Sequence, residues 1–152
     1  MSREMKYLKL YENWLRKSDD KELIEVADYI DDILLDIGDM EFPYVYPSFI
    51  HDHTTPPQIS FEISATSDNS ITEDKYELTN EIYSIIERCD EYVESVGYQM
   101  EIYVRWGAIE NATLGEYVEG QGANYMKING LKEYIGKEIH YVAITITKKN
   151  TQ

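Results

Sequence analysis

The chain has 152 residues, which is enough for one domain with a hydrophobic core but short for two. Its formal net charge of −15 argues against direct binding of nucleic acid, because an acidic surface repels phosphate groups. A single cysteine, Cys89, excludes an intrachain disulfide and a CxxC zinc site, and no apolar run is long enough for a membrane-spanning helix. We therefore expect a single cytoplasmic domain, 1–152, with no cofactor and no membrane association.

The acidic residues are unevenly distributed along the chain. Residues 22–74 contain thirteen acidic residues and no lysine or arginine, whereas residues 120–152 contain five lysines and two acidic residues. Protein surfaces normally mix the two signs of charge. Such a base-free stretch indicates that part of the folded surface is strongly negative and suited to a basic partner.

Apolar residues recur at helical spacing in three segments. The first, within residues 1–17, predicts a basic amphipathic helix. The second begins after Ser18-Asp19-Asp20, a good N-cap, and ends at Gly38. Its apolar stripe consists of Leu23, Val26, Ala27, Ile30, Leu34 and Ile37. Strand-like segments at 41–46 and 58–65 follow it, so residues 19–65 form a predicted αββ unit.

The third helix and the strands predicted after it repeat this order of elements. The helix is predicted to begin at Ser70 or Thr72 and to end at Gly97, and its apolar stripe matches that of the second helix at an offset of 59 residues. Strands are expected at 99–105 and 138–147, separated by a glycine- and tyrosine-rich loop at 106–137. Residues 70–147 would then be a second αββ unit. The predicted fold is an α+β two-layer sandwich, with a four-stranded, mostly antiparallel sheet and two helices on one face.

Acidic residues also follow helical spacing on the polar side of both helices. On the first helix they recur at steps of three and four residues, which places them on one ridge opposite the apolar stripe. Rows of carboxylates one turn apart resemble duplex phosphates in charge and attract basic surfaces. The candidate partner-binding acids are Glu25, Asp28, Asp32, Asp36 and Asp39, together with Glu77, Glu81, Glu87, Glu91 and Glu94. Adjacent acids such as Asp31-Asp32 are expected on exposed helix surface.

Tyrosine provides a second set of candidate contacts. The chain has fourteen tyrosines and three phenylalanines, and tyrosine combines contact area with a hydroxyl group. Tyr103 and Arg105 alternate with core residues of their strand, so they are predicted to face outward from the open side of the sheet. Trp106 follows at the end of that strand.

Histidines suggest an alternative, enzymatic interpretation. His51, Asp52, His53 and His140 could together supply metal ligands. His53-Thr54-Thr55 also resembles the HxT element of two-histidine phosphoesterases. That resemblance would imply that His53 is an acid or base and that Thr55 binds phosphate. His140-Tyr141-Val142 lacks the hydroxyl of the second motif, however.

The segment Met5-Lys6-Tyr7-Leu8-Lys9-Leu10-Tyr11-Glu12-Asn13 resembles the start of small, uncharacterised proteins of large tailed bacteriophages. This resemblance implies an accessory or host-directed role in the host cytoplasm, such as an acidic inhibitor or DNA mimic that acts on a host nucleic-acid-handling or defence protein.

The sequence therefore predicts a non-enzymatic protein whose acidic helices bind a basic protein surface. A small phosphodiesterase or metal-dependent enzyme centred on His51, His53, Thr55 and His140 is one alternative. A structural or self-assembling subunit, and hence a homo-oligomer, is the other.

Overall fold

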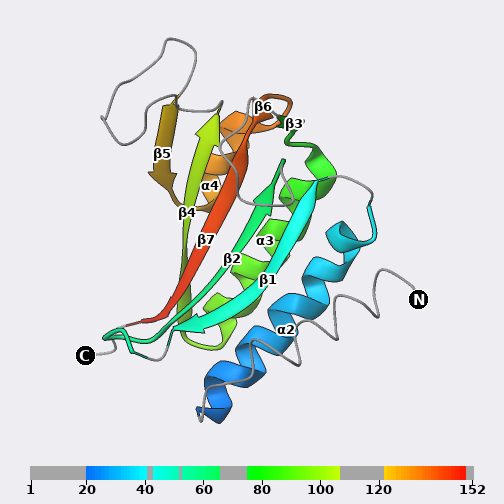
Figure 1. The fold of residues 1–152 in the computed structure, drawn as a ribbon. Coiled ribbons are helices and arrows are strands. Elements are labelled where there is room, and N and C mark those ends of the chain that lie inside the picture. Colours follow the sequence, from blue (N-terminus) through cyan, green and yellow to red (C-terminus); the bar gives the residue numbers. More distant parts are fainter. Residues whose placement is uncertain (1–19, 41–42, 52, 66–74, 107–121, 150–152) are drawn as a thin grey trace.

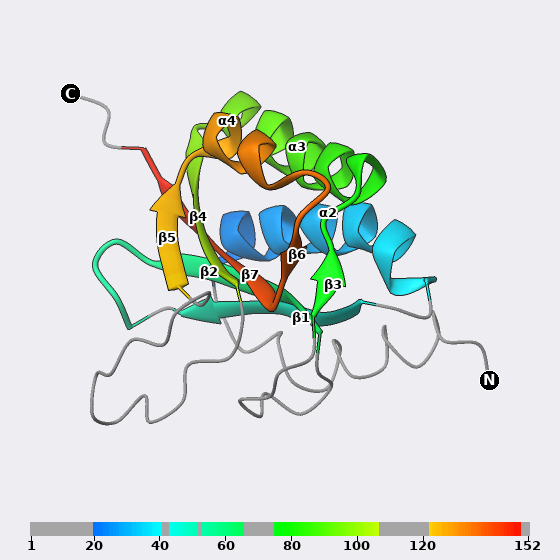
Figure 2. The ribbon, with the colours of Figure 1, turned by 90° about the horizontal axis from the view of Figure 1, so that it is seen from above.

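Two long helices, α2 (Lys21–Gly38) and α3 (Asn80–Ser95), lie side by side on one face of an antiparallel sheet (Figures 1 and 2). This arrangement comes from a computed structural model, which describes residues 20–40, 43–51, 53–65, 75–106 and 122–149. The α+β class predicted from the sequence is confirmed. The predicted N-terminal helix of residues 1–17 falls outside the described residues.

The sheet has five strands within the described residues, one more than the sequence predicted, in the order β1-β2-β7-β4-β5. A separate two-stranded sheet pairs β3 with β6, and the short helices α4 and η2 connect β5 to β6. The remaining elements are β1 (Tyr44–His51), β2 (Gln58–Ser64), β3 (Tyr76–Glu77), β4 (Tyr98–Trp106), β5 (Gly122–Met126), α4 (Ile128–Leu131), η2 (Lys132–Tyr134), β6 (Glu138–Ile139) and β7 (Tyr141–Lys148).

Local sequence explains where both long helices begin. The side chain of Asp20 accepts hydrogen bonds from the backbone N–H groups of Glu22 and Leu23, at 3.0 and 3.3 Å. Thr79 accepts one from the N–H of Ile82 at 3.2 Å. Each cap satisfies donors that the first helical turn leaves without an intrahelical partner. The two N-caps are 59 residues apart, which is the offset that relates the two apolar stripes.

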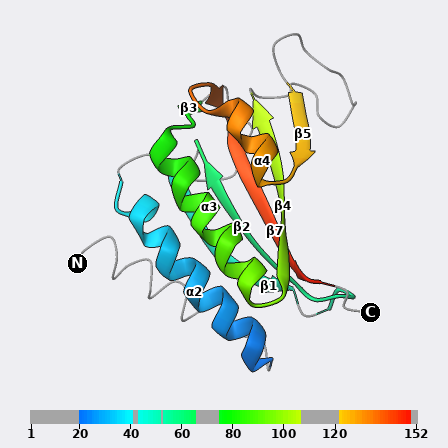
Figure 3. The same cartoon turned by 180° about the vertical axis from the view of Figure 1, so that it is seen from behind.

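The apolar stripes form the interior between the helices and the sheet. Residues Leu23, Ile30 and Leu34 of α2 are buried, as are Ile86 and Val93 of α3. The two helices run in opposite directions (Figure 3), and the second strand of each predicted unit, β2 or β7, lies at the centre of the sheet. This order is what a repeated αββ unit would give, although the duplication itself remains a prediction.

The predicted start of the third helix is wrong. The chain from Lys75 to Leu78 is extended, with β3 paired to β6, and the helix begins only after Thr79. Tyr76 is buried and its hydroxyl donates to the carbonyl of Ile63 at 2.9 Å, while Leu78 exchanges backbone hydrogen bonds with residues 136 and 137. The predicted start rested only on Ser70 or Thr72 as possible N-caps, and these tertiary contacts hold the chain before Thr79 in an extended conformation instead.

The region predicted as one loop at 106–137 also contains regular structure. Its second part forms β5, α4 and η2, and β5 extends the sheet beyond β4. The strand predicted at 138–147 is interrupted at His140, which separates β6 from β7. The N–H of His140 donates to the carbonyl of Arg105 at 2.7 Å, and its carbonyl accepts from Ala65 at 2.9 Å. The chain therefore changes its pairing partner at this residue.

A buried aspartate joins α2 to the edge strand β1. Asp31 is 3% exposed, contrary to the expectation that the Asp31-Asp32 pair is exposed. Its carboxylate accepts the backbone N–H of Ser48 at 3.1 Å and the Ser48 hydroxyl at 2.8 Å. The register of β1 against β2 shifts between Tyr46 and Phe49. The Asp31 side chain therefore satisfies the backbone N–H of Ser48 where the pairing of β1 is irregular.

We predict that Asp31→Ala destabilises the protein by about 1–3 kcal/mol, because it leaves the buried donors of Ser48 without this acceptor. Asp32→Ala, at the exposed neighbouring position, should change the free energy of unfolding by no more than about 0.5 kcal/mol. Urea denaturation of the two variants measures the difference. Equal effects would contradict a structural role for the buried carboxylate.

The thiol of Cys89 lies in the interior of α3. The side chain is fully buried, and burial raises the pKa of the thiol to about 12. The thiolate, which is the reactive form, is therefore scarce at neutral pH.

We expect the folded protein to resist alkylation of Cys89 by iodoacetamide at about pH 8, where an ordinary exposed cysteine reacts readily. The same chain in concentrated urea should be labelled fast, which mass spectrometry can follow. Equal labelling rates with and without urea would show that the thiol is not protected by the fold.

Candidate partner-binding groove

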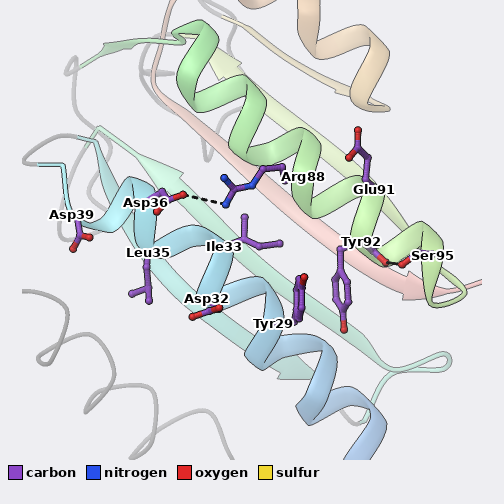
Figure 4. Close-up of a pocket in the computed structure, with 10 residues that line it drawn as sticks. All are labelled: Tyr29, Asp32, Ile33, Leu35, Asp36, Asp39, Arg88, Glu91, Tyr92 and Ser95. Atoms are coloured by element: carbon purple, nitrogen blue, oxygen red, sulfur yellow. Dashed lines mark hydrogen bonds and ion pairs between the residues drawn. The ribbon is translucent and has the colours of Figure 1, made fainter.

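A groove of about 850 Å³ lies between α2 and α3, on the outer side of the helix layer (Figure 4). Ile33 and Leu35 of α2 contribute apolar surface, and Ser95 of α3 lies at one end. The rest of the lining is charged or aromatic. Four of the carboxylates predicted to bind a partner line this groove, namely Asp32, Asp36, Asp39 and Glu91.

A pair of stacked tyrosines stands in the groove. The rings of Tyr29 on α2 and Tyr92 on α3 are parallel to within 13°, with centroids 3.9 Å apart. Tyr29 is 52% exposed, which leaves a large aromatic surface in contact with solvent. The pKa of Tyr92 is raised by burial first and by the nearby Tyr29 and Glu25 second, so its hydroxyl stays protonated at neutral pH.

One guanidinium group already occupies part of the groove. Arg88 of α3 reaches across to Asp36 of α2, and its Nη2 atom lies 3.1 Å from the Asp36 carboxylate (Figure 4). Both side chains are about half exposed, so the pair contributes little to stability. It does show that the space between the helices accommodates an arginine head group beside the carboxylates of α2.

The other groove carboxylates lack such a counter-charge. Within the described residues, Asp32, Asp39 and Glu91 form no ion pair. Four carboxylates therefore face one guanidinium, and the groove carries a net charge of −3 at neutral pH. A cation placed there would find both charge complementarity and an aromatic surface.

The remaining predicted acids lie outside the groove. Glu25 and Glu81 are exposed on their helices, Asp28 and Glu87 are partly buried, and Glu94 pairs with Lys149. Glu77 does not belong to the helical surface at all, because it lies on β3 opposite Glu138. The acidic ridge of α2 thus forms as predicted, but only part of it combines with α3 into a concave surface.

The predicted aromatic and basic contacts lie on a different face from the groove. Tyr103 and Arg105 point away from the helices, because they alternate with the buried Ile102 and Val104 of β4. Arg105 lies over the ring of Tyr141 at 5.0 Å. Tyr103 contacts the rings of Tyr125 and Tyr141, at 4.7 and 5.8 Å between centroids.

Trp106 has the opposite orientation from Tyr103 and Arg105. It shares the core-facing side of β4 with Val104 and packs against Tyr134, with ring centroids 5.7 Å apart. The partner-binding set predicted from the sequence is therefore dispersed. Four acids line the groove, the other acids lie elsewhere on the helices or on β3, and the aromatic and basic residues lie on the open sheet face or beside the core.

Glu62 of β2 lies on the same open face of the sheet. Its pKa is raised, because loss of solvent around the carboxylate outweighs the attraction of Arg105. A carboxyl group with a higher pKa in the folded than in the unfolded state favours folding at acidic pH, and that contribution is lost as the pH rises through the folded-state pKa.

We therefore predict that Glu62→Gln stabilises the protein at neutral pH and has a smaller effect below the ordinary glutamate pKa of 4.5. Thermal unfolding at both pH values measures this. A variant less stable than the parent at neutral pH would mean that attraction to Arg105 dominates over desolvation.

The alternative enzymatic constellation is not assembled. His51 lies opposite Gln58 at one end of the β1–β2 pair, and its Nε2 atom is 2.8 Å from the Ser60 hydroxyl oxygen. His140 is 2% exposed and lies next to Tyr141, which pairs with Ser64 at the other end of β2. Six residues of extended strand separate those ends, a distance of about 20 Å.

The other members of the histidine set do not close this distance. His53 and Thr55 are exposed in the turn after β1, and Asp52 falls outside the described residues. No group of three or more histidine, cysteine, aspartate or glutamate side chains suited to a metal ion occurs within the part of the chain that the structure describes.

Several residues of the groove were not predicted from the sequence. Tyr29, Tyr92 and Arg88 were not among the candidates, although Tyr29 lies one turn before Asp32 and Tyr92 one turn after Arg88. An aromatic residue on the polar side of an acidic helix was the available signal. Their meeting across the groove depends on how α2 packs against α3, which helical spacing within one segment cannot give.

Comparisons with known protein families, curated proteins and solved structures find no match to this chain. None of the helices in the described ranges has the length and apolar character needed to span a lipid bilayer.

Proposed function

We propose that this protein is a non-enzymatic binding protein whose groove between α2 and α3 receives basic side chains of a protein partner. The observation that carries the proposal is one concave surface that combines carboxylates without an ion pair among the described residues and a stacked tyrosine pair whose Tyr29 ring is exposed. Either feature alone is ordinary on a protein surface. Together they supply the two interactions that a guanidinium group uses, namely charge-assisted hydrogen bonds and stacking on an aromatic ring.

Charge supports a cationic occupant. The groove has a net charge of −3, and the whole chain carries −15, so the long-range field attracts positive surfaces and repels phosphate. The partner in this proposal is therefore a protein with an exposed basic surface rather than a nucleic acid.

The internal Arg88–Asp36 pair supports arginine over lysine. It places a guanidinium beside an α2 carboxylate with its Nη2 atom 3.1 Å from the oxygen. Asp32 lies about one helical turn before Asp36, about 6 Å along the axis, with no such partner within the described residues. An arginine from the partner would repeat this pairing one turn along the groove.

Carboxylates at successive turns of a helix also present negative charge at regular intervals, as a phosphate backbone does. A protein that normally binds nucleic acid would offer the matching basic surface. The proposal therefore includes a role as a nucleic-acid mimic or inhibitor in the cytoplasm of a bacterial host. This is the role that the resemblance of the N-terminal segment to phage proteins implied.

The test measures binding of two fluorescent peptides of equal length, one rich in arginine and one rich in lysine. We expect the arginine peptide to bind more tightly, because its head group can stack on the tyrosines as well as pair with carboxylates. Affinity should fall as salt rises from about 0.1 M to about 1 M, since the screening length shortens from about 10 to about 3 Å.

The decisive variant neutralises the three groove carboxylates that have no ion pair, Asp32→Asn, Asp39→Asn and Glu91→Gln. Its matched control changes three exposed acids outside the groove, Glu77→Gln, Glu133→Gln and Glu138→Gln. The groove variant and the control variant then both carry a net charge of −12 instead of −15. We expect the groove variant to bind the arginine peptide about tenfold more weakly, at about 0.5 kcal/mol for each exposed charge. Equal losses in the two variants would reduce the effect to net charge and contradict the groove.

A further inference from the structure

One edge of the five-stranded sheet is β5, which differs from most edge strands in its lack of features that prevent pairing with another strand. β5 pairs with β4 on one side in an unbroken register from Gly122 to Met126. On its other side, no strand or helix lies alongside within the described residues (Figures 1 and 3). An edge strand presents backbone N–H and C=O groups that can pair with a further strand.

The opposite edge, β1, has the features by which proteins prevent such pairing. It contains Pro47, which has no backbone N–H, and its register against β2 shifts between Tyr46 and Phe49. The helix α2 also packs against it. Proline, irregular register and a covering element are each known to protect sheet edges.

Among the described residues, β5 has none of these features. Its sequence, Gly-Ala-Asn-Tyr-Met, contains no proline and no charged residue, and its register is regular. Ala123 and Asn124 are exposed, and Tyr125 is 69% exposed, the highest value among the large hydrophobic side chains described. The short helix α4 packs against β5, and no other helix or strand of the described ranges lies along the outer edge of β5.

The distribution of charge limits the repulsion between two copies that meet at this edge, although each carries −15. Residues 122–149 carry five lysines and two glutamates, so this part of the molecule is locally basic. The acidic helix α2 lies over β1, at the far edge of the sheet. Two copies joined through β5 would keep their most acidic helices as far apart as the sheet allows.

We infer that β5 is a self-association surface, at which two copies pair their β5 strands in antiparallel orientation to form one continuous sheet. Identical strands are self-complementary in this orientation, because each supplies the same alternation of donors and acceptors. The interface is independent of the groove between α2 and α3, which remains open in each copy. The register that uses the whole strand places Asn124 opposite Asn124 of the second copy.

The first measurement is the solution mass of the full chain by light scattering over a range of protein and salt concentrations. We expect the mass to rise from 17.8 kDa toward twice that value with protein concentration, and to rise further with salt. Salt screens the repulsion between two acidic copies. Peptide binding in the groove should respond to salt in the opposite sense, so the two proposals can fail independently.

The position of the interface is tested by cysteine crosslinking of the full chain. Opposed Cα atoms in an antiparallel pair are about 4.5–5.5 Å apart, within the range that a disulfide bridges. Asn124→Cys should therefore form a disulfide dimer under mild oxidation much faster than Glu81→Cys, an exposed position on α3. Cys89 is buried and does not compete for the new thiol.

A charge variant completes the test. Asn124→Lys would place two ammonium groups side by side at the centre of the interface, and we expect it to remain a monomer with unchanged thermal stability. Ser84→Lys adds the same charge on an exposed position of α3 and should dimerise like the parent. A monomeric mass under all conditions, or a dimer that Asn124→Lys does not weaken, would overturn the assignment of β5.

Discussion

The contact between Asp31 and Ser48, together with the apolar stripe of α2, sets the rotation of α2 on the sheet, and the groove depends on that rotation. Asp31 points inward, with its carboxylate accepting two hydrogen bonds from Ser48. Residues around a helix are separated by about 100°, so this inward position directs Asp32 and Tyr29 toward the outer side of the helix layer. A buried carboxylate with two hydrogen-bond donors is thus the link between the edge strand and the surface that we propose to bind a partner.

The same contact explains how α2 can bury one of its carboxylates against the sheet, while its apolar stripe supplies the packing. A buried carboxylate costs free energy unless hydrogen bonds replace its lost water. The irregular register of β1 leaves a backbone donor at Ser48, and Asp31 satisfies it. The other carboxylates of α2 remain at or near the surface, where solvent moderates their mutual repulsion.

Much of the fold could be predicted from the sequence because it is encoded locally. The cap at Asp20 and the apolar stripes of both helices depend on residues within one or two turns. The cap at Thr79 is equally local, but Ser70 and Thr72 were equally good candidates by residue type. β3 could not be predicted in this way, since its two residues are held in a strand by pairing with β6, which is distant in the sequence. β5 is short and contains glycine and asparagine, so its existence depends on β4 as a template.

The candidate site was only partly predictable for the same reason. The carboxylate ridge of α2 follows from spacing within one helix, and Asp32, Asp36 and Asp39 were found by that spacing. The stacking of Tyr29 on Tyr92 joins two helices and could not be read from either alone. His51 and His140, which the enzymatic hypothesis placed in one site, lie near opposite ends of β2. Strand register, which the sequence composition does not reveal, decides which side chains meet.

The most direct test of the account is to map the binding surface by amide NMR, titrating the isotope-labelled full chain with the arginine-rich peptide. We predict that the largest shift changes fall in residues 29–39 and 88–95, on both walls of the groove. The amides of Tyr103, Arg105 and Tyr141, on the open face of the sheet, should change little. Shift changes centred on the open sheet face, with the groove amides unaffected, would contradict the account.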